Sequence, residues 1–378
     1  MEGTRKAINR ILQAIQNKEK IILFGDGDLD GVVSVVIMKE ALEILGHSPF
    51  SIFFANRIKY GYGLSEKILK AVKIKGPGLL IVMDCGTSNI RGIQKAVDMG
   101  FEVIVIDHHQ PSNVLPKAII INPHQEKQES LAKIFCAGGL TYEFTKQLLF
   151  EAQKEFNPEQ FLEMAMLATI YDQVPLEGKN QEIIDQGLFS LPQTQRIGLK
   201  ALLEATDCQV FDYTEVQGKL IPALAAGLYK NYQDEAFLLL VEQNPGKAIK
   251  IAEVLLKRRE EKKERIIAII EEIQESADTS LPIIFSGSKD WPLPLLGIVA
   301  SKLCGYFLKP AFIYSQARGV SQGSVRTPKE IDSIDMMKPC ADLLINYGGH
   351  PQASGFGLKN KDIAKFKKCL IENYKLIF

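Results

Sequence analysis

The sequence predicts an α/β protein with an N-terminal, doubly wound and mostly parallel sheet, a helical connector and a smaller C-terminal α/β domain. Short apolar runs alternate with amphipathic helical patterns over residues 20–123. An almost wholly helical pattern covers residues 196–276, and strand patterns return after it. Alternating strands and helices form parallel sheets with helices on both faces, so the first observation decides the fold class.

The length of 378 residues favours more than one domain, because a single hydrophobic core rarely grows beyond about 250–300 residues. We expect an N-terminal domain over residues 1–195, the helical connector over residues 196–278 and the C-terminal domain over residues 279–378. Each outer domain is long enough to bury a core of its own.

Apolar runs in the first domain are expected to be strands at residues 21–24, 51–54, 79–83, 103–106 and 118–121. Three of these runs end at an acid, namely Asp26, Asp84 or Asp107. Ligands of open parallel sheets bind at the carboxyl ends of the strands. The sequence therefore predicts a line of acidic side chains along one edge of the sheet.

The remaining elements follow from the same patterns. Two helices are expected over residues 133–171, and the Pro- and Gly-containing residues 175–187 indicate the edge of this unit. The C-terminal domain is expected to contain a strand at residues 281–285, a helix at 297–304, a strand at 311–314 and a closing helix at 362–374.

Composition is that of a globular protein, with 46% hydrophobic and 24% charged residues. No apolar run approaches the ~20 residues that cross a bilayer, and the N-terminus has no apolar signal core, so a cytoplasmic protein without membrane contact is expected. The six cysteines are scattered singly, which predicts reduced thiols. Because the formal net charge is zero, a polyanionic partner would be attracted by local patches or bound cations.

The segment after the first strand places Asp26, Asp28 and Asp30 at alternate positions. Carboxylates packed so closely repel one another unless cations lie among them. The alternative is a hydrophilic turn at a helix N-terminus, where acids are favoured by the helix dipole.

Further candidate ligands follow later strands and helices. Asp84 ends one strand, and His108 and His109 directly follow Asp107 at the end of another. Asp172 follows an apolar helical pattern, where an unpaired carboxylate is costly to bury and opposes the helix dipole. Hard oxygen donors with imidazole, and no competing set of thiolates, favour one or two Mn²⁺ or Mg²⁺ ions.

Several motifs follow one another along almost the whole chain: Asp26-Gly27-Asp28-Leu29-Asp30-Gly31, Asn56-Arg57 with Gly61-Tyr62-Gly63-Leu64, Asp84-Cys85-Gly86, Asp107-His108-His109-Gln110-Pro111 leading to Asn122-Pro123, Asp172-Gln173-Val174-Pro175-Leu176, and Gly348-Gly349-His350 with Ala353 and Gly355. In this order the motifs resemble those of the DHH phosphoesterase family, and most of all those of its RecJ-type nuclease branch.

The resemblance implies two Mn²⁺ or Mg²⁺ ions about 4 Å apart that activate a water for in-line attack on a phosphodiester. The implied metal ligands are Asp26, Asp28, Asp30, Asp84, His108 and Asp172. Asp84 would lie between the ions, Asp107 would support the ligands, and His109 would lie near the scissile phosphate. These residues would make residues 1–195 the catalytic domain.

The resemblance also assigns substrate contacts to residues 279–378 as a DHH-associated domain. A loop with Gly348, Gly349 and His350 would hold the phosphate and nucleoside, although a turn before a strand would also explain the glycines. Arg326 would grip a phosphate. Arg57 is a weaker candidate, because one arginine in a loop is usually only solvated.

The sequence departs from the family pattern in two ways. Gly27 stands where a larger residue is common, which could loosen the first loop without removing a ligand. The fullest RecJ exonucleases add an oligonucleotide-binding barrel and further C-terminal sequence, for which we find no room, so we expect a weaker grip on long single strands.

The resemblance favours a phosphodiesterase that digests single-stranded nucleic acid, DNA in the first place, from an end to nucleoside monophosphates. The first alternative is a phosphodiesterase for very short RNAs or for linear and cyclic dinucleotides. The second alternative is a protein that serves as a partner in a replication complex and whose own catalytic activity is dispensable. Replication or repair proteins are expected as partners. The presence of every expected carboxylate ligand favours an active enzyme.

Overall fold

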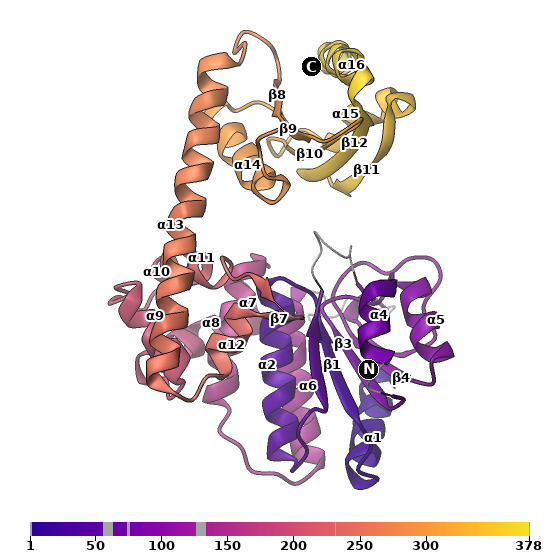
Figure 1. Cartoon of the computed structure of the whole chain (residues 1–378), viewed down its shortest axis with the longest axis vertical. Coiled ribbons are helices and arrows are strands. Elements are labelled where there is room, and N and C mark those ends of the chain that lie inside the picture. Colours follow the sequence, from indigo (N-terminus) through magenta and orange to yellow (C-terminus); the bar gives the residue numbers. More distant parts are fainter. Residues whose placement is uncertain (1, 56–62, 74–75, 126–133, 231, 378) are drawn as a thin grey trace. The chain divides into compact units, whose positions relative to one another are not determined.

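The computed structural model describes residues 2–55, 63–73, 76–125, 134–230 and 232–377 (Figure 1). The chain forms two compact units, Met1–Arg259 and Glu260–Phe378. The division lies inside the segment for which the sequence predicts a helical connector. No helix among the described residues is long and apolar enough to cross a membrane.

The first unit is built on a parallel sheet in which the strand order is β2-β1-β3-β4-β5. The strands are β1 (Ile21–Gly25), β2 (Ser51–Phe54), β3 (Leu79–Met83), β4 (Glu102–Ile106) and β5 (Ile119–Ile121). All neighbouring strands run parallel. The five strands and the doubly wound sheet predicted from the apolar runs are confirmed.

Helices cover both faces of this sheet. On one face, α1 (Glu2–Gln16), α2 (Leu29–Ile44), α6 (Ala137–Glu151) and α7 (Glu159–Asp172) share a core with Ile21 and Leu23. On the other face, α4 (Glu66–Lys73) and α5 (Ile90–Asp98) pack on Ile22 and Phe24. Alternate residues of β1 thus enter different cores, which explains why this strand is apolar throughout.

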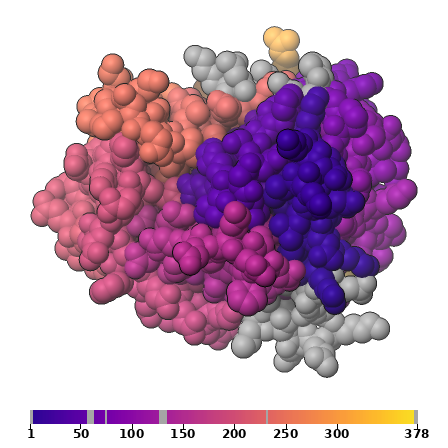
Figure 2. Space-filling view, turned by 90° about the horizontal axis from the view of Figure 1, so that it is seen from below, coloured from indigo at the N-terminus to yellow at the C-terminus, as the bar shows by residue number. Residues whose placement is uncertain are grey.

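Further helices complete the first unit: α8 (Lys179–Ser190), α9 (Ile197–Ala205), α10 (Tyr213–Glu215), α11 (Ile221–Leu224), α12 (Glu235–Val241) and the first part of α13 (Pro245–Ser276). A short antiparallel pair of β6 (Tyr229–Lys230) and β7 (Gln233–Asp234) lies between α11 and α12. The α8 helix occupies much of residues 175–187, where the sequence indicated an edge, and the unit continues to Arg259. Figure 2 shows indigo N-terminal residues beside magenta residues on one surface.

The second unit has a mixed sheet with the order β11-β12-β10-β9-β8. The strands are β8 (Ile284–Ser288), β9 (Ala311–Gln316), β10 (Val320–Arg326), β11 (Leu344–His350) and β12 (Ala353–Lys359). One face packs on α14 (Leu296–Phe307) and the end of α13, and the other on α15 (Ser333–Met337) and α16 (Ile363–Ile377).

Two expectations for the second unit are wrong. Gly348 and Gly349 do not lie in a loop, because they belong to the edge strand β11 and pair with Gly355 and Ser354 of β12. Reduced thiols were expected throughout, but Cys340 and Cys369 form a disulfide between the segment before β11 and α16. The two cysteines are 29 residues apart, so no local pattern in the sequence indicates the pairing. The other four cysteines are buried and form no disulfide.

Candidate metal centre

The sheet backbone itself fixes three acids at the carboxyl ends of its central strands. Each acid donates its amide to the last residue of the neighbouring strand. These hydrogen bonds join Asp26 N to Met83 O at 3.1 Å, Asp84 N to Ile106 O at 2.9 Å, and Asp107 N to Ile121 O at 3.1 Å. The predicted line of acids along one sheet edge is therefore present.

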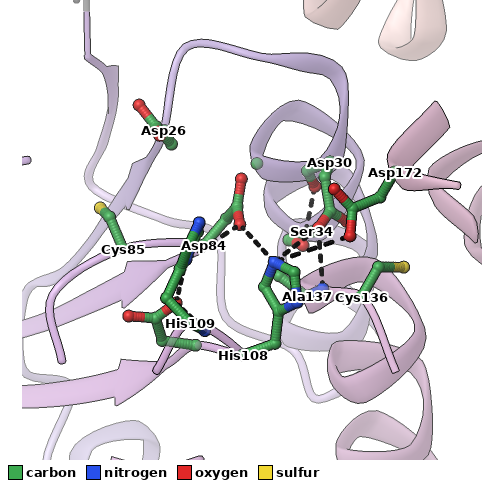
Figure 3. Close-up of polar contacts among 12 residues, drawn as sticks. Asp26, Asp30, Ser34, Asp84, Cys85, His108, His109, Cys136, Ala137 and Asp172 are labelled. Atoms are coloured by element: carbon green, nitrogen blue, oxygen red, sulfur yellow. Dashed lines mark hydrogen bonds and ion pairs between the residues drawn. The ribbon is translucent and has the colours of Figure 1, made fainter. Parts of the chain in front are cut away.

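Asp84 occupies the centre of this line in an unusual backbone conformation. Its φ of +60° is in the left-handed region, which aspartate tolerates better than most residues, and its exposure is only 2%. Figure 3 shows the Asp84 carboxylate directed toward His108, with Asp26 on its other side. A strained conformation at a buried acid is typical of functional sites.

The side chains form groups whose ligand atoms lie within 4.8 Å of one another. The groups are Asp26, Asp28 and Asp84; Asp30, His108 and Asp172; and Asp84, His108 and His109. Asp84 belongs to the first and the third group. The structure thus brings together every metal ligand named from the sequence, in an arrangement in which Asp84 links the two sides.

The Nε2 atom of His108 faces three carboxylates at once. It lies 3.5 Å from Asp84 Oδ1, 3.7 Å from Asp30 Oδ2 and 3.8 Å from Asp172 Oδ2 (Figure 3). Burial, reinforced by the neighbouring His109, lowers the pKa of His108 to about 4. A neutral imidazole at neutral pH has a lone pair available for a metal ion.

Asp30 is held by a helix N-terminus that the sequence did not reveal. Ala137 N donates to Asp30 Oδ2 at 2.8 Å and Gly138 N donates to Oδ1 at 2.7 Å, both from the first turn of α6. These amides and the helix dipole favour a carboxylate at this place. A Cβ on Gly138 would lie 2.4 Å from Ala168 Cβ, so the close approach of α6 requires glycine here.

The buried carboxylates destabilise one another. Burial, followed by repulsion from Asp172 and Asp28, raises the pKa of Asp30 well above its ordinary value. Burial, followed by repulsion from Asp28 and Asp30, does the same to the pKa of Asp84. A divalent cation would relieve these repulsions, and oxygen donors with a neutral imidazole suit Mn²⁺ or Mg²⁺, so the residues fit the metal.

Asp107 does not join these groups but holds His109. Its Oδ1 atom is 2.7 Å from His109 Nδ1 and accepts the His109 amide at 3.2 Å, while Oδ2 accepts the Thr87 amide at 2.9 Å. Burial acts to raise the pKa of Asp107, but the hydrogen bond and charge of His109 outweigh it and lower the pKa to about 2. The carboxylate therefore only accepts, and Nδ1 of His109 carries the proton.

The predicted substrate residues belong to other parts of the chain. Arg57 lies outside the described residues. In the second unit, Gly348, Gly349 and His350 are exposed on the edge strand β11. Arg326 ends β10, is half-buried, and donates from Nη1 to Val325 O at 2.9 Å.

Comparison with known proteins places this geometry in a family. A model of the N-terminal domain of the DHH family matches residues 20–169. The single-stranded-DNA-specific exonuclease RecJ of Bacillus subtilis (strain 168) is 30% identical over 98% of this chain and 48% of its own length. The chain therefore spans about half the length of this curated relative.

Solved structures agree with this match. A crystal structure of exonuclease RecJ bound to manganese superposes with a TM-score of 0.84 and 26% identity, covering 100% of this chain and 95% of that one. RecJ from Thermus thermophilus in complex with Mn²⁺ has a TM-score of 0.85 at 24% identity, covering 100% of this chain and 55% of that one, and shows the same fold. The strand-end acids and Asp107-His108-His109 lie inside the matched residues, so residues 20–169 are an N-terminal domain of the DHH family, and the chain as a whole is RecJ-like in sequence and fold.

Proposed function

We propose that the chain is a metal-dependent phosphodiesterase that digests single-stranded nucleic acid, preferentially DNA, from an end to nucleoside monophosphates. The observation that carries the proposal is the position of Asp84, which forms one ligand group with Asp26 and Asp28 and lies 3.5 Å from His108 of the group with Asp30 and Asp172. The similarity to curated single-stranded-DNA exonucleases supports the substrate class.

We assign the metal ligands to Asp26, Asp28, Asp30, Asp84, His108 and Asp172, with Mn²⁺ or Mg²⁺ as the ions; Asp84 belongs to two of the ligand groups. Two bound cations would supply an activated water and would neutralise the charge that develops on a phosphodiester. The RecJ structure bound to manganese supports Mn²⁺ as the ion.

The chain's own residues position the reacting groups. The α6 amides hold both oxygens of Asp30, so this carboxylate is fixed before a ligand arrives. Asp107 fixes the tautomer and orientation of His109, whose ring is 42% exposed and therefore accessible to a phosphate. Such fixed donors stabilise a transition state without further reorganisation.

Substrate binding is assigned to the second unit, with Arg57 as a further candidate in the first. Gly348 has no heavy atom within 4 Å of an added Cβ, so the backbone at this residue of β11 is open to close approach. His350 on the same exposed strand and Arg326 on β10 would bind phosphate oxygens. Replication or repair proteins as partners, and the cytoplasm as the location, stay predictions.

The test is hydrolysis of end-labelled DNA and RNA from dinucleotide to long single strand, in Mn²⁺ and then in EDTA. We expect Mn²⁺-dependent release of mononucleotides from single-stranded DNA at rates that hold or rise with length, and no activity in His108→Ala. Cleavage confined to dinucleotides would instead indicate the short-oligonucleotide phosphodiesterase. Absence of Mn²⁺-dependent cleavage at every length would contradict the proposal and favour the partner role.

A further inference from the structure

We propose that Asn122 is a positioning residue for His109, acting through a closed ring of hydrogen bonds with Thr87 and Asp107. The inference rests on the proposed function, in which His109 lies beside the scissile phosphate. Asn122 directly follows β5 and is 2% exposed. The sequence singled it out within a motif but assigned no role to it.

The ring consists of four residues and the hydrogen bonds between them. Asn122 Nδ2 donates to Thr87 Oγ1 at 3.0 Å and to the His109 carbonyl oxygen at 2.9 Å. Thr87 N donates to Asp107 Oδ2 at 2.9 Å. His109 closes the ring through Nδ1, 2.7 Å from Asp107 Oδ1.

Asn122 connects the loops that follow three neighbouring strands. Thr87 lies in the loop after β3, His109 in the loop after β4, and Asn122 itself after β5. Both hydrogens of its amide are used within the ring, and its Oδ1 accepts the amide of His124 at 2.9 Å. A carboxylate or an aliphatic side chain at this position could not donate either bond.

Hydrogen bonds hold the backbone amide, the ring and the carbonyl group of His109. Asp107 accepts hydrogen bonds from the His109 amide and ring, while Asn122 donates to the His109 carbonyl oxygen. The loss of Asn122 would free the carbonyl and the Thr87 hydroxyl, and both changes move the imidazole relative to Asp84. Such supporting partners typically contribute about 10- to 100-fold in activity.

The loss should act on kcat more than on the Michaelis constant or the affinity for Mn²⁺. The side-chain hydrogen bonds of Asn122 go to Thr87, His109 and His124, and none of these three residues is an assigned metal ligand. We therefore expect Asn122→Ala and Asn122→Asp to lower kcat on single-stranded DNA about 10- to 100-fold, with the Michaelis constant and the Mn²⁺ dissociation constant within about threefold of the wild type.

A buried asparagine in the second unit provides the matched control. Asn373 donates from Nδ2 to the carbonyl oxygens of Asp335 and Met336, at 3.4 and 3.0 Å, so Asn373→Ala removes two similar bonds without touching the ring. Within the ring, Thr87→Val removes the hydroxyl acceptor and Thr87→Ser keeps it. The Val variant should lose kcat and the Ser variant should recover it.

The deciding experiment measures kcat, Michaelis constant, Mn²⁺ affinity and thermal unfolding for these variants and for the double variant Asn122→Ala/Thr87→Val. We expect the double variant to be no slower than Asn122→Ala, because both changes open one ring. A folded Asn122→Ala with wild-type kcat, a loss as large in Asn373→Ala, or a loss of Mn²⁺ affinity that accounts for the lower rate would overturn the inference. An inactive wild type would instead refute the proposed function.

Discussion

Replacing Asp84 by asparagine should make the metal-free protein more stable while removing its stabilisation by Mn²⁺. The carboxylates of Asp26, Asp28 and Asp84 have oxygens within 4.8 Å of one another. At that distance and an effective dielectric constant of about 20, one pair of full charges repels by about 3.5 kcal/mol. The amide introduced by Asp84→Asn would keep the shape of the side chain and remove this repulsion.

The effect should depend on pH in a defined direction. Burial and the neighbouring carboxylates raise the pKa of Asp84 in the folded protein. The folded state therefore loses stability as pH rises from about 4, the value for an unfolded aspartate, through the raised pKa. In EDTA, the advantage of Asp84→Asn over the wild type should be small at pH 5 and largest at pH 8.

Thermal unfolding with and without Mn²⁺ measures both halves of the prediction. At pH 8 in EDTA, Asp84→Asn should unfold up to about 10 °C above the wild type. Mn²⁺ at 100 times its dissociation constant should add about 2.7 kcal/mol to the wild type and much less to the variant. A variant that is less stable than the wild type in EDTA, or that Mn²⁺ stabilises as much as it stabilises the wild type, would refute the electrostatic reasoning.

Three further predictions test other parts of the structure. Gly138→Ala should lower the free energy of unfolding by about 1–3 kcal/mol and weaken Mn²⁺ binding, because its Cβ would lie 2.4 Å from Ala168 Cβ and 3.1 Å from Asp30 Oδ1. Gly218→Ala is the control, because an added Cβ there meets nothing within 4 Å. Equal losses of stability for the two variants in denaturant titrations would contradict the packing argument. Burial raises the pKa of Glu163 to about 7 despite its hydrogen bond from Thr194, so folding stability falls as pH rises from about 4.5 to 7. Glu163→Gln should therefore match the wild type at pH 5 and exceed it by about 3 kcal/mol at pH 8, and an unfolding free energy difference that does not grow with pH would count against this sign. Arg326→Ala should raise the Michaelis constant for single-stranded DNA about tenfold or more with little change in kcat. The control Arg318→Ala, at an exposed position before β10, should leave both constants unchanged. An unchanged Michaelis constant in Arg326→Ala would show that this residue does not bind the substrate phosphate.

The carboxyl-end line of acids could be predicted because strand ends are visible in the sequence. The apolar runs that end at Asp26, Asp84 and Asp107 define both the sheet and its edge, and parallel topology brings those ends together. Asp172 was found for a related reason, since a carboxylate at the end of an apolar helix needs a partner.

Other features depend on contacts between distant residues and left no local signal. The amides of Ala137 and Gly138 reach Asp30 across more than 100 positions, and Asn122 meets Thr87 across 35. Every residue except proline has a backbone N–H group, so the sequence does not show which amides will bind a carboxylate. In the second unit, β10, β11 and β12 are rich in glycine and serine, so the alternation that marks a strand is weak.

Anomalous diffraction at the manganese edge, from crystals of the protein grown with Mn²⁺, would show where the ion binds. We expect two peaks beside Asp84, one within reach of Asp26 and Asp28 and the other within reach of Asp30, His108 and Asp172. In Asp84→Asn both peaks should weaken or vanish. No peak among these side chains in the wild-type protein, or manganese bound only elsewhere, would contradict the claim that the strand-end residues form a metal centre.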